Sequence, residues 1–182
     1  MSVHESEMVL RLAELKRMFD RTFAAAPCSD TSIQEDLLAV GVGGDSYAIR
    51  LSEVGGLLSD RNITRLPGSA TELIGLMGLR GALVPVYDLR ALLGYPGGPA
   101  PRWLLIAAAA RVALAFDRFD GHLRVSREAV CAESSRGAAN HSHVCEVVRT
   151  ADAVRPIVHL PSVLDAIAAL VRRRPRRKGN DS

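Results

Sequence analysis

The chain has 182 residues, of which 48% are hydrophobic and only 4% aromatic, and its formal net charge is +3. This length and apolar content suit one domain or two closely packed subdomains. The scarcity of aromatic side chains argues against a stacking surface for single-stranded nucleic acid. The longest apolar run, residues 103–110, is too short to span a bilayer. His4, Glu5 and Glu7 stand where a signal peptide needs an apolar run, so we expect a cytoplasmic protein.

The positive charge is concentrated near the C-terminus, and the rest of the chain carries a net charge of −3. The basic tail, residues 172–182, contains Arg172, Arg173, Arg174, Arg176, Arg177 and Lys178. Such a tail can bind the phosphates of nucleic acid or anionic lipid. It can equally continue the basic end of a preceding helix, where cations interact favourably with the helix dipole. Both interpretations stay open.

An amphipathic helix is predicted near the N-terminus, over residues 5–26. Its apolar residues recur at steps of three and four and form one stripe: Met8, Leu12, Leu15, Phe19 and Phe23. Pro27 ends the helix, and a polar linker follows. The stripe is expected to pack on the domain or against a second copy of the chain. The alternative is a docking helix for a partner, so residues 1–36 form an expected helix and linker outside the main domain.

Short strands separated by turn signals dominate the following part of the chain. Residues 37–42 and 47–51 read as two strands joined by a Gly-Gly-Asp-Ser turn. Residues 63–66 read as another strand, and Ser69 is a candidate cap of a short helix. This spacing of strands and turns is typical of an all-β barrel or sandwich.

The central stretch, GLRGALVPVYDLR at residues 78–90, combines a turn, a strand and a helix start. Gly81 permits a turn after Arg80, and residues 83–86 read as a strand in which Leu83, Val84 and Val86 are buried. Pro85 has no N–H to donate and therefore predicts an edge, bulge or bend. Asp88 is expected to cap a short helix that Gly94 ends.

The second half of the chain repeats the β pattern after a segment rich in glycine and proline, residues 95–102, which is the expected boundary between two β subdomains. Residues 103–109 and 112–116 predict a hairpin. Further strands are expected at residues 123–125, 144–148 and 156–160, and Pro161 opens a last helix.

No enzymatic motif rises above background in the sequence. A phosphate-binding glycine loop, a nucleophile elbow and paired Cys-x-x-Cys motifs are all lacking. Asp88, Asp117 and Asp120 are best explained as caps. His141, His143 and Cys145 could share one face of a strand and hold a metal, but a closed zinc site needs a fourth ligand. We therefore expect no metal, no cofactor and no catalysis.

The central stretch also carries a family resemblance. It resembles the motif NLRGxxxPVxDLR of the CheW-like domain family, the coupling module of bacterial chemosensory signalling. Residues 37–54 resemble that family's opening hairpin, residues 63–81 the segment leading into the motif, and residues 111–121 a later strand pair. These matches occur in the family's order and cover about residues 37–167.

The resemblance implies a mostly β fold of two small five-stranded barrels, SH3-like or OB-like, packed side by side. The first would span about residues 37–94 and the second about residues 103–160, and a helix over residues 161–171 would complete a domain of residues 37–171. It also implies a non-catalytic, cytoplasmic adaptor that couples the cytoplasmic tip of a chemoreceptor to a CheA-type histidine kinase, with no cofactor. Self-association through the N-terminal helix is a further expectation.

Positions can be carried over from the family motif one by one. Arg80 and Gly81 correspond to the motif residues near the receptor groove, and Val54 and Leu57 correspond to its apolar lining. Leu105 and Val112 would neighbour the kinase or receptor face.

Two positions depart from the family pattern. Gly78 replaces the motif asparagine, and Gly56 stands where an acidic residue is frequent. If Arg80 normally pairs with that acid, Glu53 is the nearest substitute.

A second hypothesis belongs to a different class. The β scaffold could be recruited to nucleic acid or to an anionic membrane, with the basic tail from Arg172 to Lys178 as the anchor.

Overall fold

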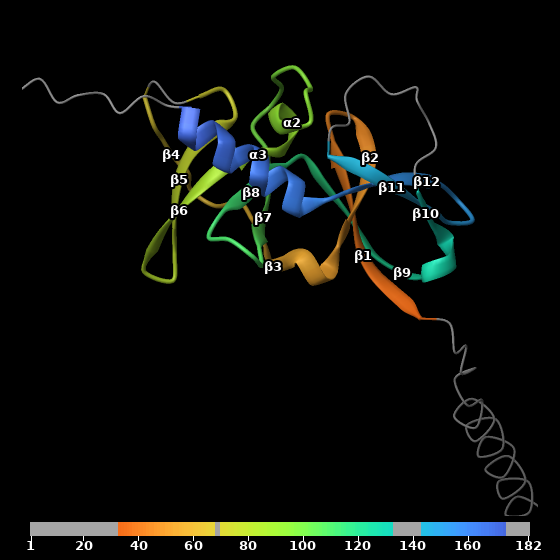
Figure 1. The fold of residues 1–182 in the computed structure, drawn as a ribbon. Helices are drawn as coiled ribbons and strands as arrows, with labels where there is room; N and C mark the ends of the chain where they lie inside the picture. Colours follow the sequence, from red (N-terminus) through yellow and green to blue (C-terminus); the bar gives the residue numbers. More distant parts are fainter. Residues whose placement is uncertain (1–32, 68–69, 133–142, 174–182) are drawn as a thin grey trace, which may run out of the picture. The chain divides into compact units, whose positions relative to one another are not determined.

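The computed structural model describes residues 33–67, 70–132 and 143–173. In this part the chain is mostly β, as expected, with two six-stranded mixed sheets and two α-helices (Figure 1). The predicted N-terminal helix, the Ser69 cap and tail residues 174–182 lie outside the described residues. None of the described helices is long and apolar enough to cross a membrane.

The first sheet, called sheet A here, has the strand order β10-β11-β12-β2-β1-β9. All neighbours are antiparallel except β12 and β2, which are parallel. Its strands are β1 (Gln34–Val42), β2 (Asp45–Arg50), β9 (Arg118–Ser126), β10 (Val130–Ala132), β11 (Val144–Arg149) and β12 (Val154–Val158).

The second sheet, sheet B, has the order β3-β7-β8-β6-β5-β4, in which only β6 and β8 are parallel. Its strands are β3 (Val54–Ser59), β4 (Thr64–Arg65), β5 (Leu73–Leu79), β6 (Ala82–Asp88), β7 (Trp103–Ala107) and β8 (Ala113–Phe116). The helical elements are η1 (Leu51–Glu53), α2 (Leu89–Leu92), η2 (Arg127–Ala129) and α3 (Leu160–Arg173).

The sheets differ from the expected pair of five-stranded barrels. Each sheet has six strands and takes them from both sides of residues 95–102, so the sheets do not divide there into about 37–94 and 103–160. Across the described residues, no pairing joins the first and last strands of either sheet, so neither is closed by hydrogen bonds into a barrel. The sequence did not reveal this arrangement, because the parallel pairs β12–β2 and β6–β8 require long crossovers, and local residue patterns carry no signal of such crossovers.

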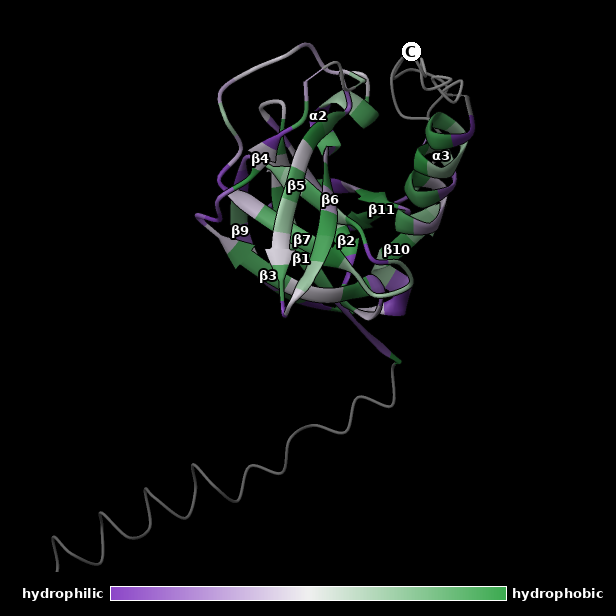
Figure 2. Cartoon of the chain, turned by 90° about the vertical axis from the view of Figure 1, so that its left-hand side faces the viewer, coloured by the Kyte–Doolittle hydropathy of each residue, from purple (hydrophilic) through white to green (hydrophobic). Residues whose placement is uncertain are grey.

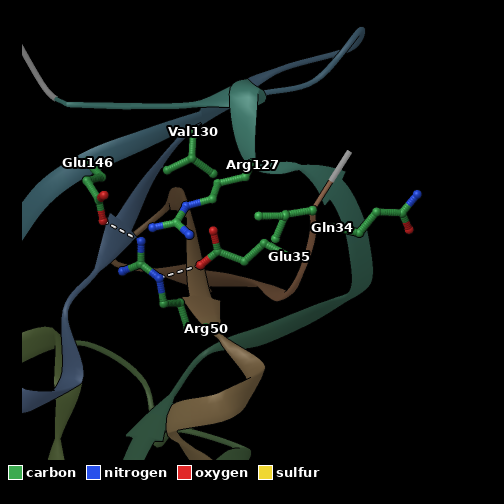
Figure 3. Close-up of a pocket in the computed structure, with 7 residues that line it drawn as sticks. Gln34, Glu35, Arg50, Arg127, Val130 and Glu146 are labelled. Carbon is green, nitrogen blue, oxygen red and sulfur yellow. Dashed lines mark hydrogen bonds and ion pairs between the residues drawn. The ribbon is translucent and has the colours of Figure 1, made fainter. Parts of the chain in front are cut away.

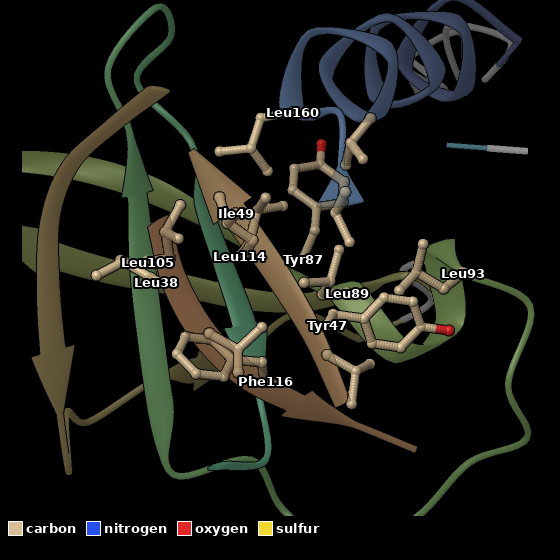
Figure 4. Close-up of a cluster of buried hydrophobic side chains, with 14 of the residues drawn as sticks. Leu38, Tyr47, Ile49, Tyr87, Leu89, Leu93, Leu105, Leu114, Phe116 and Leu160 are labelled. Atoms are coloured by element: carbon tan, nitrogen blue, oxygen red, sulfur yellow. The ribbon is translucent and has the colours of Figure 1, made fainter. Parts of the chain in front are cut away.

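Three hydrophobic clusters hold the sheets. The central cluster lies between sheets A and B and includes Tyr47, Leu114 and the α3 residue Val163 (Figure 4). A second cluster lies on the other face of sheet B around Met77, and a third lies on the other face of sheet A around Leu37. Both sheets therefore have buried side chains on two faces, and the inner strands such as β7 and β8 are almost wholly apolar (Figure 2).

Strand β8 shows how the alternation of side chains serves two clusters at once. Leu114 and Phe116 point into the central cluster, whereas Ala113 and Ala115 belong to the second cluster. All four residues are buried. Because successive side chains of a strand point to opposite faces, a strand with no polar residue is required where both faces are covered.

The central motif folds largely as its local chemistry predicts. The side chain of Asp88 accepts a hydrogen bond from the backbone N–H of Arg90 and caps α2, and Gly94 ends that helix with a φ of 83°. Pro85 lies just before the part of β6 that pairs with β8, which confirms the expected edge position. Val84 and Val86 are buried, but the prediction for Leu83 is wrong: it is 70% exposed. Its cross-strand neighbour is Gly78, which has no side chain to cover it.

A buried ion pair links α2 to the junction of β8 and β9. The guanidinium of Arg90, 4% exposed, donates to Asp117 and to the carbonyl of Pro99 at 3.2 Å. The second oxygen of the Asp117 carboxylate accepts the N–H of Gly43 at 2.8 Å. A Cβ at Gly98 would lie 1.7 Å from the guanidinium, so a larger residue there would have to displace the Arg90 side chain. This Arg90–Asp117 joint ties sheet B to the β1–β2 turn of sheet A, and Asp117 is not the cap expected from sequence.

Candidate functional site

The positions carried over from the family motif gather mainly at one end of sheet B. Strand directions place the start of β3, the β7–β8 turn and the β5–β6 turn at this end. Val54, Val112, Arg80 and Gly81 therefore share one end of the sheet. Leu57 follows further along β3.

The β5–β6 hairpin extends past its neighbours at this end. Strand β8 begins opposite Val86, so residues 82–85 project beyond it by four residues, about 13 Å (Figure 1). Arg80 and Gly81 form the tip and have φ values of 49° and 77°. Glycine adopts this left-handed conformation readily, which explains Gly81, and Arg80 is exposed there. Three strand spacings, about 14 Å in all, separate β6, which begins after this tip, from β3.

The apolar candidates share one face of sheet B, the face toward sheet A. Val54, Leu57 and Val112 are half-buried and pack on the edge of the central cluster. Leu83 lies on the same face, because it stands four positions before Tyr87 on β6 and residues an even number of positions apart share a face; Tyr87 belongs to the central cluster. We call Val54, Leu57, Leu83 and Val112 the apolar margin. Sequence reasoning missed Leu83, and the missing side chain at Gly78 is the signal that could have found it.

Leu105 does not belong to this surface. Its side chain is fully buried in the central cluster, so it cannot contact a partner directly in this structure. The residue lies mid-strand in β7, between β3 and β8, where both edges and both faces are covered. It supports the apolar margin from beneath.

The suggested substitute partner of Arg80 is occupied elsewhere. The carboxylate of Glu53 accepts the backbone N–H of Leu160 at 3.1 Å and so holds the start of α3. The ion pairs within the described residues do not include Arg80. An ideal Cβ at Gly56 meets only Ile106, at 3.8 Å, so the first atom of a side chain would fit at this position. Arg80 thus presents its charge to solvent at the hairpin tip.

The histidine and cysteine of the suspected metal site point in different directions. His143 is buried, and its Nδ1 lies 2.9 Å from the hydroxyl of Ser162 on α3. Burial, and secondarily the nearby His159, lowers the pKa of His143. Cys145 is exposed. Among the residues described, no three His, Cys, Asp or Glu side chains form a metal-binding group, and His141 lies outside them.

A polar pocket of about 500 Å³ lies in sheet A, away from these candidates. In Figure 3 the guanidinium of Arg50 bridges Glu35 and Glu146, and the side chain of Arg127 lies beside this group. Burial would lower the pKa of Arg50, but the hydrogen bonds to Glu146 and Glu35 raise it overall. Arg50 of β2 thus links Glu35 of β1 to Glu146 of β11.

Of the basic tail, only Arg172 and Arg173 fall within the described residues. Arg172 is exposed near the end of α3. The Nε of Arg172 donates to the carbonyl of Ala168 at 3.2 Å, so this cation satisfies the last turn of its own helix. The interpretation of the tail as the basic end of a helix applies to this residue.

Comparison with known proteins identifies the family. A model of the CheW-like domain matches residues 36–168. The chain therefore belongs to the CheW-like family, whose members are non-catalytic scaffold or adaptor proteins of chemotaxis signalling.

Three relatives place the family in different bacteria. A probable chemotaxis protein CheW of Rhizobium etli is 30% identical over 99 residues, 52% of this chain and 64% of the relative. Chemotaxis protein CheW of Bacillus subtilis is 36% identical over 62 residues, 34% of this chain and 40% of the relative. Protein PilI of Pseudomonas aeruginosa is 30% identical over 84 residues, 46% of this chain and 47% of the relative. Each match thus spans less than two thirds of the relative's length.

A solved structure supports the fold. The crystal structure of the scaffolding protein TtCheW from Thermoanaerobacter tengcongensis superimposes with a TM-score of 0.63 at 17% sequence identity. The match covers 69% of this chain and 89% of that one. The two-sheet arrangement is therefore that of a CheW-like fold.

Proposed function

We propose that this chain couples the cytoplasmic tip of a chemoreceptor to a CheA-type histidine kinase, and that the apolar margin with Arg80 is its main receptor-binding surface. The observation that supports this proposal most directly is Leu83, a large apolar side chain 70% exposed beside the projecting hairpin tip. Contiguous apolar surface rimmed by polar groups marks sites that proteins bind, because its burial supplies affinity and a nearby charge supplies orientation.

The chemistry of the surface defines the partner it fits. Val54, Leu57 and Val112 are half-buried, so a partner would cover only their remaining exposed parts. An amphipathic helix meets such a surface with one apolar stripe. Arg80 at the tip would then pair with an acidic side chain at the border of that stripe. A helical hairpin of a receptor tip has this form.

A pull-down with receptor and kinase tests the site. Leu83→Asp places a charge in the apolar margin and should weaken receptor binding at least ~10-fold. Val154→Asp is the matched control, because Val154 is an apolar residue of sheet A that is 60% exposed. Arg80→Glu should also weaken receptor binding, with the exposed Arg65 of β4 changed to Glu as its control. Equal binding by Leu83→Asp, Arg80→Glu and the unchanged chain would refute the site.

One further experiment distinguishes the adaptor function from the alternative function, recruitment by the basic tail. Deleting residues 174–182 leaves α3 intact and removes most of the tail's charge. Under the adaptor proposal, kinase and receptor binding persist after the deletion. Loss of partner binding together with loss of sedimentation on anionic vesicles would favour the tail as anchor.

A further inference from the structure

The polar pocket in Figure 3 lies at one open end of sheet A. The sheet curls, because its two outer strands, β9 and β10, are connected by only the three residues of η2. The third hydrophobic cluster fills the inside of this curl and includes the fully buried Leu37, Ala48 and Val148. The pocket is therefore the end of an apolar interior, a place where small-molecule sites commonly form.

Charged side chains take over from the apolar ones at this end. Glu35, Arg50 and Glu146 each stand two positions from a residue of the third cluster on their own strand, so they share its inner face. Their side chains are 22%, 20% and 37% exposed, in that order. Charges so close to a core require partners, and Arg50 has two, one glutamate on each side. Together the three side chains carry one net negative charge.

A second guanidinium faces this group from η2. Arg127 lies beside the ion pairs in Figure 3, and among the described residues its own guanidinium joins no ion pair. Its backbone is held on both sides. The N–H of Arg127 donates to the carbonyl of Ile33 at 2.9 Å, and the hydroxyl of Ser126 accepts the N–H of Glu128 at 3.3 Å. Arg127 thus brings an unpaired cation to the pocket from a fixed backbone.

The charges of the pocket favour a zwitterion over a simple ion. A simple anion would be attracted by Arg127 and repelled by the net negative group around Arg50, and a simple cation would meet the reverse. A carboxylate can accept two parallel hydrogen bonds from the Arg127 guanidinium. Glu35 and Glu146 each use one oxygen for Arg50, so the second oxygen of each can accept from an ammonium group.

The remaining lining of the pocket is partly apolar. Val130 is half-buried, and Ile33 is 68% exposed. The volume of about 500 Å³ is within the range of about 300–1,000 Å³ that small-molecule sites have. An aliphatic group that covered Ile33 and Val130 would add affinity by burying apolar surface.

We propose that this pocket binds a free α-amino acid with an aliphatic side chain. The carboxylate of the ligand binds Arg127, its ammonium group binds Glu35 and Glu146, and its side chain lies against Val130. The bound amino acid links η2 to β1 and β11 and so closes this end of sheet A.

Titration of the full chain with leucine, followed through the amide chemical shifts in NMR spectra, tests the proposal. We expect saturable shifts at the residues that line the pocket. Isocaproate, which lacks only the ammonium group, and isopentylamine, which lacks only the carboxylate, are the matched probes. Each should bind at least ~10-fold more weakly than leucine, because each leaves charged groups of the pocket without a partner.

A pair of arginine variants tests the assigned contact. Arg127→Gln removes the cation and should weaken leucine binding at least ~10-fold. Arg124→Gln is the matched control, because Arg124 is an exposed arginine of β9 that pairs with Asp36 outside the pocket. It should leave the affinity for leucine unchanged. Both side chains are exposed, so neither change should disturb the fold.

Four results would overturn the proposal. They are the absence of a saturable shift with leucine, shifts that occur only away from the pocket, equal affinities for leucine and isocaproate, and equal affinities of the two variants for leucine. Equal affinities for leucine and isocaproate would indicate a simple anion site instead. The test uses neither receptor nor kinase, so its outcome is independent of the proposed adaptor function.

Discussion

The outer strands β9 and β3 show how differently the two sheets meet solvent. Strand β9 closes sheet A with charged residues at alternate positions. Arg118 pairs with Asp120, and Asp36 of β1 binds His122 at 3.0 Å and Arg124 at 3.5 Å. Strand β3 closes sheet B with the sequence VGGLLS, which has no charge and includes two glycines.

This difference gives the β9 and β3 edges different surface chemistry. Charges on an edge strand discourage pairing with other chains, because burying them is unfavourable. An uncharged edge beside exposed apolar side chains leaves contact with other proteins open. The β9 edge of sheet A is therefore guarded by charge, whereas the β3 edge of sheet B lies beside the apolar margin. The following experiments break or sharpen this contrast.

Breaking the Arg90–Asp117 joint should have one of the two largest effects, because it links the two sheets. Asp117→Ala leaves the buried guanidinium of Arg90 without its carboxylate and the Gly43 N–H without an acceptor. We expect the free energy of unfolding to fall by about 3 kcal/mol, measured by urea denaturation. Asp120→Ala, which breaks an exposed ion pair on β9, is the control and should leave stability nearly unchanged. Similar losses in the two variants would contradict this assignment.

Substitutions at Leu105 and Leu83 should distinguish a side chain that supports the apolar margin from one that contacts a partner on the same face of sheet B. Leu105→Ala removes a fully buried side chain from the central cluster and should cost about 3 kcal/mol of unfolding free energy. Leu83→Ala removes an exposed side chain and should change it by less than about 0.5 kcal/mol. Receptor affinity, measured on folded protein, should show the reverse order. A drop in affinity for Leu105→Ala alone would move the contact site to β7.

Acidification should loosen the contact between β11 and α3. Burial lowers the pKa of His143, so the native state binds a proton less readily than the unfolded state. The stability that the neutral ring contributes is present above the ordinary histidine pKa of about 6.5 and is lost as the pH falls through the lowered value. The melting temperature should therefore fall more in the unchanged protein than in His143→Gln between about pH 7.5 and 5.5. Parallel curves for the two proteins would exclude His143 as a source of the pH dependence.

The smallest effect on stability is expected from giving β3 the kind of charge that β9 has. A Cβ at Gly55 would lie 3.4 Å from the carbonyl of Ala107, an ordinary contact, and its φ requires no glycine. Gly55→Lys should change the unfolding free energy by less than about 0.5 kcal/mol. Receptor or kinase binding should weaken several-fold if a partner approaches this edge. Unchanged binding would restrict the contact surface to the hairpin and the remaining margin.

Features governed by neighbouring residues could be predicted from the sequence. Asp88 caps α2, Gly94 ends it, and Gly81 supports the left-handed turn at Arg80. Pro85 lies where β6 lacks a second neighbour. Each of these depends on backbone chemistry within a few residues, which the sequence displays directly.

Features governed by distant residues could not be predicted. Leu105 appeared suitable for a partner contact, but β3 and β8 enclose its strand. Leu83 appeared buried, but Gly78 opposite leaves it uncovered. The structure places three of the motif positions, Val54, Val112 and Arg80, at one end of sheet B. Their contact with a partner stays a prediction.

The parallel pairing of β2 with β12 has a consequence for biosynthesis. Ala48, made early, finds its neighbour Ile157 only when nearly the whole domain has left the ribosome. Until then the apolar β1–β2 hairpin lacks the strand that completes its sheet, and long-range pairing of this kind is slow. The nascent chain must keep that hairpin from aggregating with other polypeptides. Correct folding therefore depends on synthesis of the last thirty or so residues of the domain.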